Sequence, residues 1–371
     1  MKRREFLIVA GSTVAVAGLT YYLRSDKTNF VREDSKQNPI GRFPLTTDER
    51  EILFLASLAP SGHNTQPWFI KYLEPYHWII CNDKTRWLTA VDPTQRETIL
   101  SIGAFAQTLE YAAANAGYNC AFTILASTNQ DENMLDVKLT EASIVTAFDI
   151  AKIKSRRTVR SNYLNDGLKK EDEVFLFTDE KEFFNFIPVG SKDYQYLNEQ
   201  TIEANKIQSY RDAAEKELAE WIRFSSKEAE KNRDGLTTGS MEIEGVPGFI
   251  VRNFYNKSNV MKNSFRDKNI ENVIKQVSQS AGWLLITSKD NSVATLLETG
   301  KRMQRLFLKV RDKGIAIHPM TQILEEATTK QNINQLIGIT DNIQFILRMG
   351  YVKDYPAPVS LRRPVDWFVR T

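Results

Sequence analysis

Residues 103–109 read GAFAQTL and residues 300–306 read GKRMQRL, and these two segments indicate how the chain is organised. Glycine, glutamine and leucine recur at the same offsets, and each segment is followed at the same distance by a further glycine, Gly117 or Gly314. Both lie in amphipathic helical patterns that precede an apolar stretch. We therefore expect two copies of one unit, an intramolecular pseudo-dimer whose repeated helices pack about a local two-fold axis. The alternative is two unrelated amphipathic helices.

The sequence around the first copy predicts alternating helices and strands. Thr46 and Glu49 have the spacing of a helix-capping pair ahead of an apolar stretch. Residues 69–72 and 77–81 are aromatic and β-branched runs on either side of a turn, which predicts a hairpin. A long helix is expected to begin at Asp92-Pro93 and to end at Gly117, and a strand to follow at 120–125.

Composition excludes several classes of protein. The 371 residues are 42% hydrophobic, enough for a full core in two domains or one large one. Lys and Arg number 49 against 46 Asp and Glu, which argues against a nucleic-acid partner. The 2 cysteines and 3 histidines are too few and too scattered to predict a disulfide framework or a metal site. Any chemistry is therefore expected from a bound organic cofactor.

The N-terminus reads as a targeting segment. Lys2, Arg3 and Arg4 precede an apolar run at 6–23, a pattern close to a twin-arginine export signal. We expect residues 1–24 to form this signal or, if uncleaved, a membrane anchor, and residues 25–44 to form a polar tether. The protein would then use the twin-arginine export machinery and reside in the periplasm or cell envelope. The alternative is a buried N-terminal helix of a cytosolic protein.

Three further segments carry polar groups suited to a ligand. Residues 59–68, APSGHNTQPW, offer amides and a hydroxyl on a rigid turn, which suits the edge of a planar heterocycle, although an ordinary turn is the alternative. Residues 154–163, KSRRTVRSNY, place three arginines around Thr158 and can clamp a phosphate, unless they form a solvated face. The third segment, FILRMGY at 345–351 followed by LRRPVD at 361–366, adds paired arginines, or else a surface tail.

Together these segments resemble the nitroreductase family of FMN-binding proteins, over everything after Leu45. The resemblance is closest to the subgroup in which one long chain contains two nitroreductase-like halves, here 45–150 and 151–371. It implies an α+β fold in which a mixed, mostly antiparallel sheet is flanked by helices, duplicated as a pseudo-dimer. It also implies FMN at the interface between the two units.

The resemblance assigns a cofactor role to residues in each motif. The arginine-rich segment would bind the FMN phosphate and ribityl chain, and the C-terminal arginines would complete the phosphate site. The turn from the other half would touch the isoalloxazine ring. The residues so assigned are Ser61, Gly62, Asn64, Arg156, Arg157, Thr158, Arg160, Arg362 and Arg363. Because neither motif recurs in the opposite half, we expect one FMN per chain.

An insertion at 223–265 has no counterpart in the first half and is rich in charge and glycine. Long irregular segments beside a site are often lids, and the resembling subgroup has a comparable segment over its flavin. Residues 246–249 are therefore candidates to close over the cofactor. The alternative is an exposed loop on the far side of the molecule.

The resemblance implies an oxidoreductase in which FMN carries the electrons. A small donor would reduce FMN, and a small acceptor such as a nitroaromatic or quinone would then take the electrons. No catalytic side chain is assigned, and His63 is a weak candidate for a proton donor. Export would separate the protein from cytoplasmic NAD(P)H, so membrane quinol or a partner protein is an alternative donor.

The rival hypothesis is a non-catalytic protein that sequesters or stores flavin under its lid. Met241 or Phe249 filling the open face of the flavin would favour storage. A third class, a membrane-tethered module with a decayed site, is opposed by the preserved arginine segment.

Overall fold

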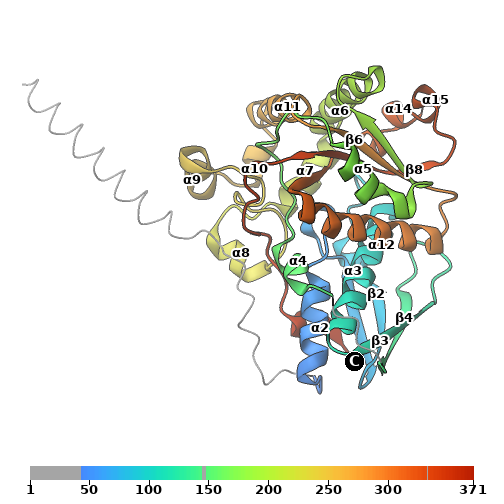
Figure 1. The fold of residues 1–371 in the computed structure, drawn as a ribbon. Helices are drawn as coiled ribbons and strands as arrows, with labels where there is room; N and C mark the ends of the chain where they lie inside the picture. Colours follow the sequence, from blue (N-terminus) through green and yellow to red (C-terminus); the bar gives the residue numbers. More distant parts are fainter. Residues whose placement is uncertain (1–42, 144–147, 332) are drawn as a thin grey trace, which may run out of the picture.

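The computed structural model describes residues 43–143, 148–331 and 333–371 (Figure 1). The predicted signal at 1–24 and residues 25–42 of the predicted tether lie outside these ranges. Within the described ranges, no helix combines the length and the apolar character needed to cross a membrane.

The first sheet has the strand order β3-β4-β2-β1-β9. Neighbouring strands are antiparallel, except that β1 and β9 run parallel. The hairpin predicted at 69–72 and 77–81 is confirmed as β1 and β2, and the strand predicted at 120–125 is β3. The bounds are β1 (Trp68–Glu74), β2 (His77–Asn82), β3 (Tyr118–Ile124), β4 (Asn133–Glu141) and β9 (Val369–Arg370).

The second sheet has the order β5-β6-β8-β7, with all neighbours antiparallel. The order β7-β8-β6-β5 repeats the order β3-β4-β2-β1 of the first sheet, strand for strand. In each unit one long helix joins the second strand to the third. The expected α+β class with mostly antiparallel sheets is confirmed. The bounds are β5 (Phe184–Pro188), β6 (Gly282–Ser288), β7 (Ile315–Pro319) and β8 (Asn342–Tyr351).

The two repeated segments lie on α3 (Arg96–Asn115) and α12 (Val293–Lys309), which pack against each other through their glycines. A Cβ atom added at Gly103 would lie 2.1 Å from the carbonyl oxygen of Leu297, and one added at Gly300 would lie 2.0 Å from that of Leu100. Each glycine thus meets the residue three positions before the other glycine. The predicted contact between the repeated helices is confirmed, and it is reciprocal.

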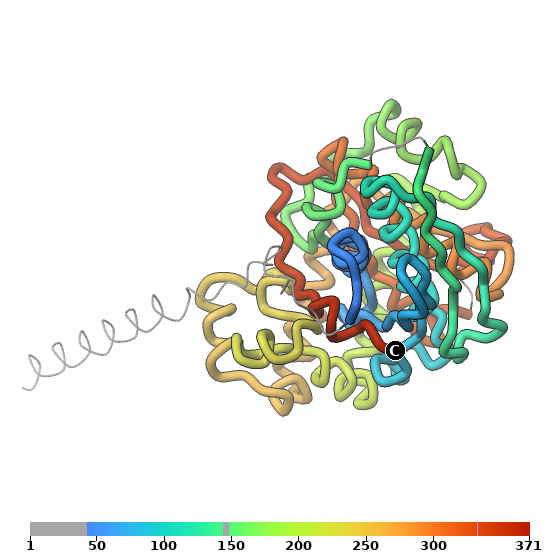
Figure 2. Tube along the Cα trace, turned by 90° about the horizontal axis from the view of Figure 1, so that it is seen from below, coloured from blue at the N-terminus to red at the C-terminus, as the bar shows by residue number. Residues whose placement is uncertain are grey.

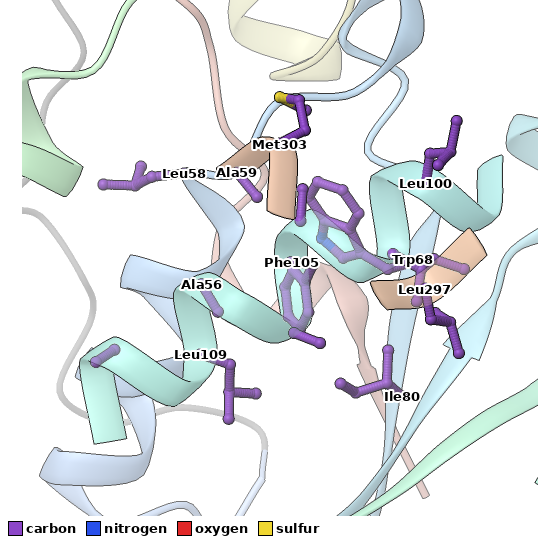
Figure 3. Packing of buried hydrophobic residues seen from close by; sticks show 14 of the residues in the cluster. Ala56, Leu58, Ala59, Trp68, Ile80, Leu100, Phe105, Leu109, Leu297 and Met303 are labelled. Atoms are coloured by element: carbon purple, nitrogen blue, oxygen red, sulfur yellow. The ribbon is translucent and has the colours of Figure 1, made fainter. Parts of the chain in front are cut away.

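One apolar core extends across both units. Its largest cluster of buried residues includes Trp68 of β1, Phe105 of α3 and Leu297 of α12 (Figure 3). The ring centroids of Trp68 and Phe105 lie 4.9 Å apart. Because α3 and α12 bury side chains in the same cluster, the two units fold around a common interior rather than as separate domains.

The predicted helix ends are confirmed to within a few residues. α2 (Thr47–Ser57) begins with the capping pair, in which the Thr46 hydroxyl accepts from the amide of Glu49 and the Glu49 carboxylate accepts from the amide of Thr46. α3 begins at Arg96, later than the predicted Asp92-Pro93. Asp92 instead accepts a hydrogen bond from the amide of Thr98 and so holds the first turn from outside.

A long helical connection joins β5 to β6, whereas β1 and β2 are joined by a tight turn. The predicted insertion at 223–265 lies inside this connection. Its helices are α6 (Lys192–Tyr210), α7 (Asp212–Trp221), α8 (Ser226–Asn232), α9 (Gly245–Phe254), α10 (Lys257–Val260) and α11 (Asn263–Val277).

The C-terminal segment returns to the first unit. Figure 2 shows it in red beside α2 in blue, where Arg50 of α2 pairs with Asp366 at 3.0 Å. It then adds β9 to the edge of the first sheet. The other α-helices of the described residues are α4 (Ile150–Ser155), α5 (Lys170–Phe177), α13 (Gln322–Glu325), α14 (Ala327–Lys330), α15 (Ile333–Ile337) and α16 (Val365–Phe368).

Candidate functional site

The turn between α2 and β1 is strained. His63, Asn64 and Gln66 have φ values of 48°, 56° and 53°, in the left-handed region that non-glycine residues seldom adopt. The Ser61 hydroxyl accepts a hydrogen bond from the amide of Gln66 at 3.0 Å and closes the turn. Gly62 lies at its edge, where an added Cβ would lie 3.1 Å from Leu88. Such over-determined strain is concentrated at ligand-binding sites.

Asn64 ties this turn to two distant segments. Its side-chain amide donates to the carbonyl oxygens of Gly235 and Leu361 at 3.0 and 3.1 Å. Its side-chain oxygen accepts from Arg362 at 2.8 Å. Asn64 and Arg362, assigned to the same site from opposite ends of the sequence, are therefore in direct contact.

Arg156 and Arg362 converge on the C-terminal end of α2. Both guanidinium groups donate to the carbonyl oxygen of Leu58, at 2.9 and 3.1 Å, and Arg362 also donates to that of Ala59 at 3.2 Å. The Arg156 guanidinium also lies 4.9 Å from the ring centroid of Phe307 on α12. Cationic groups are favoured at a helix C-terminus, and α2 has no basic residue in its last turn.

Arg363 holds the other end of the turn. Its guanidinium donates to the carbonyl oxygens of Gln66 and Trp68, each at 2.6 Å, and its amide donates to the side chain of Gln66 at 3.0 Å. Burial and the nearby Arg86 lower the pKa of Arg363 to about 9. Arg363 thus fixes the path of the chain into β1.

Arg157, Arg160 and Ser161 surround a carboxylate that the sequence did not indicate. Glu242 accepts from the Arg157 guanidinium at 3.3 Å, from the Arg160 amide at 3.0 Å and from the Ser161 hydroxyl. The same turn supplies backbone acceptors, because Arg157 donates to Gly239 and Arg160 donates to Ser240. Thr158 lies between the two arginines and is partly buried.

Two neutral histidines adjoin Arg160. His318 Nε2 lies 2.7 Å from the Arg160 guanidinium, and because arginine only donates, Nε2 accepts and the proton belongs on Nδ1. Burial and the charge of Arg160 lower the pKa of His63 to about 4, and with Arg348 they lower that of His318 well below its usual value. His63 is therefore neutral near pH 7, which gives no support to a proton-donating role.

Arg348 of β8 completes the cluster. Its guanidinium donates to the carbonyl oxygen of Arg160 at 2.5 Å and lies 4.2 Å from the ring centroid of Tyr163. Arg348 lies within the segment 345–351, but no local pattern in the sequence marks Arg348, His318 or Glu242 as part of a site. The alternation of β8 places Arg348 opposite His318 of β7, a pairing that only the sheet register reveals.

The donor set fits an anionic phosphate. Arg156, Arg157, Arg348 and Arg362 are all buried, and burial lowers the pKa of Arg160 and Arg348. Buried positive charge is costly unless an anion is near, and within the described part of the chain Glu242 supplies a carboxylate to Arg157. Guanidinium groups, a backbone amide and a hydroxyl are the donors that bind phosphate in proteins.

The insertion touches this site from one side. Met241 packs with Ile222, Phe224 and Val260 in an apolar cluster that belongs mainly to the insertion itself. Phe249 packs edge-on against Phe254 of the same helix, with ring centroids 6.1 Å apart. Val246 is 61% exposed. Gly235 and the turn at 239–242 make contacts with the candidate residues.

Comparison with known proteins agrees with the sequence motifs, although no protein-family model matches the chain. The chain is 25% identical over 345 residues to acg of Mycobacterium tuberculosis, an NAD(P)H nitroreductase by name, covering 87% of this chain and 95% of that protein. It is 21% identical over 324 residues to PigM of Serratia, likewise an NAD(P)H nitroreductase by name, covering 83% and 89%.

Solved structures align less extensively. A nitroreductase-like family protein from Bacillus cereus aligns with a TM-score of 0.32 and 15% identity, over 62% of this chain and 98% of that one. The FMN-dependent nitroreductase NfnB from Mycobacterium smegmatis, in complex with NADPH, aligns with a TM-score of 0.34 and 17% identity, over 60% and 94%. Over most of its length, this chain is thus similar in sequence to proteins named as NAD(P)H nitroreductases.

Proposed function

We propose that this protein is an FMN-binding oxidoreductase that passes electrons from a reduced donor to a small acceptor of the nitroaromatic or quinone type. The observation that carries the proposal is the convergence of arginines from distant parts of the sequence. Arg156 and Arg362 share the Leu58 carbonyl next to the strained turn at 61–66, and Arg362 also bonds to Asn64 of that turn. Arg157 and Arg160 of the same segment as Arg156 donate to the Glu242 carboxylate. When bound, FMN would supply the electron-transfer chemistry. The protein would supply binding, orientation and charge.

The residues divide the work by position. The phosphate and ribityl chain would be held by the arginine segment together with one C-terminal arginine, namely Arg156, Arg157, Thr158, Arg160 and Arg362. Ser61, Gly62 and Asn64 would meet the ring, while Arg363 keeps the turn in place. This division across the chain suits a pseudo-dimer, a view supported by the shared strand order and the reciprocal glycine contacts.

The relatives' names point to NAD(P)H as donor, whereas the predicted export signal favours a donor available outside the cytoplasm. We propose export through the twin-arginine route, with membrane anchoring if residues 1–24 are retained. Replacing Arg3 and Arg4 with lysine should then leave the protein in the cytoplasmic fraction on cell fractionation. Export of the variant at the normal level would overturn the proposal.

The full-length protein provides the direct test of cofactor and donor. We expect it to be yellow as purified, or to become so on addition of FMN, and to bleach on anaerobic mixing with NADPH if nicotinamide is the donor. A nitroaromatic or quinone should then restore the oxidised spectrum. A protein that cannot take up FMN would exclude both the enzyme and the storage hypothesis.

Storage remains the second candidate, because the turn at 239–242 is bonded directly to the arginine segment. The insertion that carries this turn adjoins the site, and it would cover the ring of a bound flavin once the turn has left the phosphate donors. Flavin that binds tightly yet is bleached neither by NADPH nor by a reduced quinone would favour storage over turnover.

Replacing Arg156 and Arg160 together with alanine should weaken FMN binding by roughly a hundredfold or more, because two charged hydrogen-bond donors are lost. Flavin fluorescence titration measures the change. The matched control replaces Lys152 and Lys154 with alanine. These lysines lie just before the arginines but pair with carboxylates elsewhere on the surface, so the control should bind FMN like wild type. Unchanged affinity in the arginine variant, with a normal melting temperature, would show that the phosphate binds elsewhere.

A further inference from the structure

We propose that Glu242 is an internal competitor of the cofactor phosphate, a latch that must leave the arginine segment before FMN can load. The inference rests on the proposed function, because it concerns the phosphate end of the same site. It adds a device that couples cofactor binding to movement of the insertion.

The carboxylate makes the contacts expected of a bound anion. Its two oxygens accept from a guanidinium group, a backbone amide and a hydroxyl, supplied by Arg157, Arg160 and Ser161. Its side chain is only 7% exposed, so water does not replace these donors. Phosphate oxygens accept from the same kinds of donor.

Two of these donors cannot serve both anions at once. The Arg160 amide and the Ser161 hydroxyl each carry a single proton, and both protons are directed to Glu242. A phosphate that uses them must therefore displace the carboxylate. Two anions held side by side on the same arginines would also repel each other in a buried site.

Glu242 is held in a conformation that its backbone does not favour. Its φ is 58°, in the left-handed region, and its neighbours are fixed by Arg157 bonding to Gly239 and Arg160 bonding to Ser240. Loss of the carboxylate contacts would release part of this constraint. The strained turn is thus suited to two positions rather than one.

Movement of the turn would be transmitted to α9. Arg252 of that helix donates to the Thr238 hydroxyl at 3.1 Å, which links α9 to the turn. One face of α9 is exposed and is therefore not held by packing. It carries Val246, Ile250 and Phe254, which are 61%, 41% and 65% exposed. We infer that displacement of Glu242 by phosphate moves the turn at 239–242 together with α9.

Flavin affinity with and without the phosphate tests the latch. The full-length protein is stripped of flavin, and the dissociation constants of FMN and of riboflavin are measured for wild type, Glu242→Gln and Glu244→Gln. The latch predicts FMN affinity about tenfold higher in Glu242→Gln and unchanged riboflavin affinity, because only FMN competes for the donors. Glu244 is exposed and two residues away, so its variant should match wild type.

Three outcomes would overturn the latch: weaker FMN binding in Glu242→Gln, no change, or an equal gain for riboflavin. Weaker binding would mean that Glu242 positions the arginine side chains for the phosphate instead of competing with it. An equal gain would mean that the insertion blocks the ring rather than the phosphate.

A second measurement needs no flavin. Limited proteolysis of the flavin-free chain should cut within 233–256 faster in Glu242→Gln than in Glu244→Gln, and inorganic phosphate should accelerate the cut in wild type. If these differences in cleavage rate are found but FMN does not bind, Glu242 competes with a phosphate as proposed, and the proposal that FMN is the cofactor is contradicted. Equal cleavage in both variants, insensitive to phosphate, would exclude the latch whatever the cofactor.

Discussion

Glu215 of α7 shows how one buried carboxyl group contributes to the pH dependence of stability. It is 3% exposed, and among the described residues its Oε2 atom has no hydrogen-bond partner. Burial raises the pKa of Glu215 to about 7. At pH values between the ordinary pKa of a glutamate and about 7, the folded protein keeps the Glu215 proton whereas the unfolded chain has released it. The contribution of Glu215 to stability therefore declines as pH rises through 7.

Replacing Glu215 with glutamine should remove that decline. Relative to wild type, the unfolding free energy of the variant should be about 1–3 kcal/mol higher at pH 8 than it is, relative to wild type, at pH 5. Urea denaturation at both pH values measures it. Glu199→Gln on α6 serves as the control, because that side chain is exposed. A difference that does not change with pH would show that Glu215 is ionised in the folded protein throughout.

Single residues of the candidate site were predictable where local chemistry marks them. The glycine, proline and amides at 59–67 predict a constrained turn, and the arginines at 156–160 predict an anion site. Glu242 carries no such mark, because its meaning depends on Arg160, which is 82 positions away. The same holds for His318, whose partner is fixed by strand register and by the path of a distant loop.

At the scale of elements, the crossing of α3 and α12 is the contact most sensitive to a single methyl group. Gly300→Ala would gain up to about 1 kcal/mol in helix propensity. The added Cβ would however lie 2.0 Å from the backbone oxygen of Leu100, so the helices must separate. We expect a net loss of about 2 kcal/mol or more in unfolding free energy, and a similar loss for Gly103→Ala.

Gly167→Ala is the matched control for this prediction. An added Cβ there meets nothing closer than Val189 Cγ1 at 3.9 Å. This substitution should be neutral or stabilise the protein by up to about 1 kcal/mol, through the unfolded state. If Gly300→Ala behaves like Gly167→Ala in thermal and urea unfolding, the helices do not approach as closely as described.

Elements with local signals were predicted, and those made by long-range pairing were not. The hairpin of β1 and β2, the cap of α2 and the end of α3 follow from turn residues, capping residues and periodicity. β9 has only two residues, Val369 and Arg370, and exists because the C-terminal segment returns to β1. No periodicity marks so short a strand, so its pairing could not be read from the sequence.

At the scale of the whole molecule, the C-terminal segment binds the second unit to the first. It supplies Arg362 to the turn after α2, Asp366 to α2 itself and β9 to the first sheet. One core lies beneath all of these contacts. The candidate site is therefore built from both units and depends on their common folding, which explains why its two motifs are so far apart in the sequence.

The corresponding place in the second unit is chemically different. The segment from 178 to 183 joins α5 to β5, as the turn at 58–67 joins α2 to β1, but it carries Asp179 and Glu180 in place of amides. Glu180 pairs with Arg302 and Arg305 at 2.5 and 2.6 Å, and Asp179 pairs with Lys309 at 2.7 Å. Nearby cations are thus already neutralised by the protein.

This asymmetry predicts one FMN per chain. A pocket lies beside the acidic segment, lined by Tyr111, Phe148, Arg302 and Glu180 among others, but a phosphate there would meet carboxylates that already hold the cations. The ratio of flavin released on denaturation to protein chain, measured by absorbance and amino-acid analysis, should approach one after saturation with FMN. At an FMN concentration that just saturates the wild type, Arg156→Ala with Arg160→Ala should lower this ratio to a small fraction of one. A ratio near two would contradict the prediction and indicate a second site, for which the acidic segment holds the equivalent position between helix and sheet in the second unit.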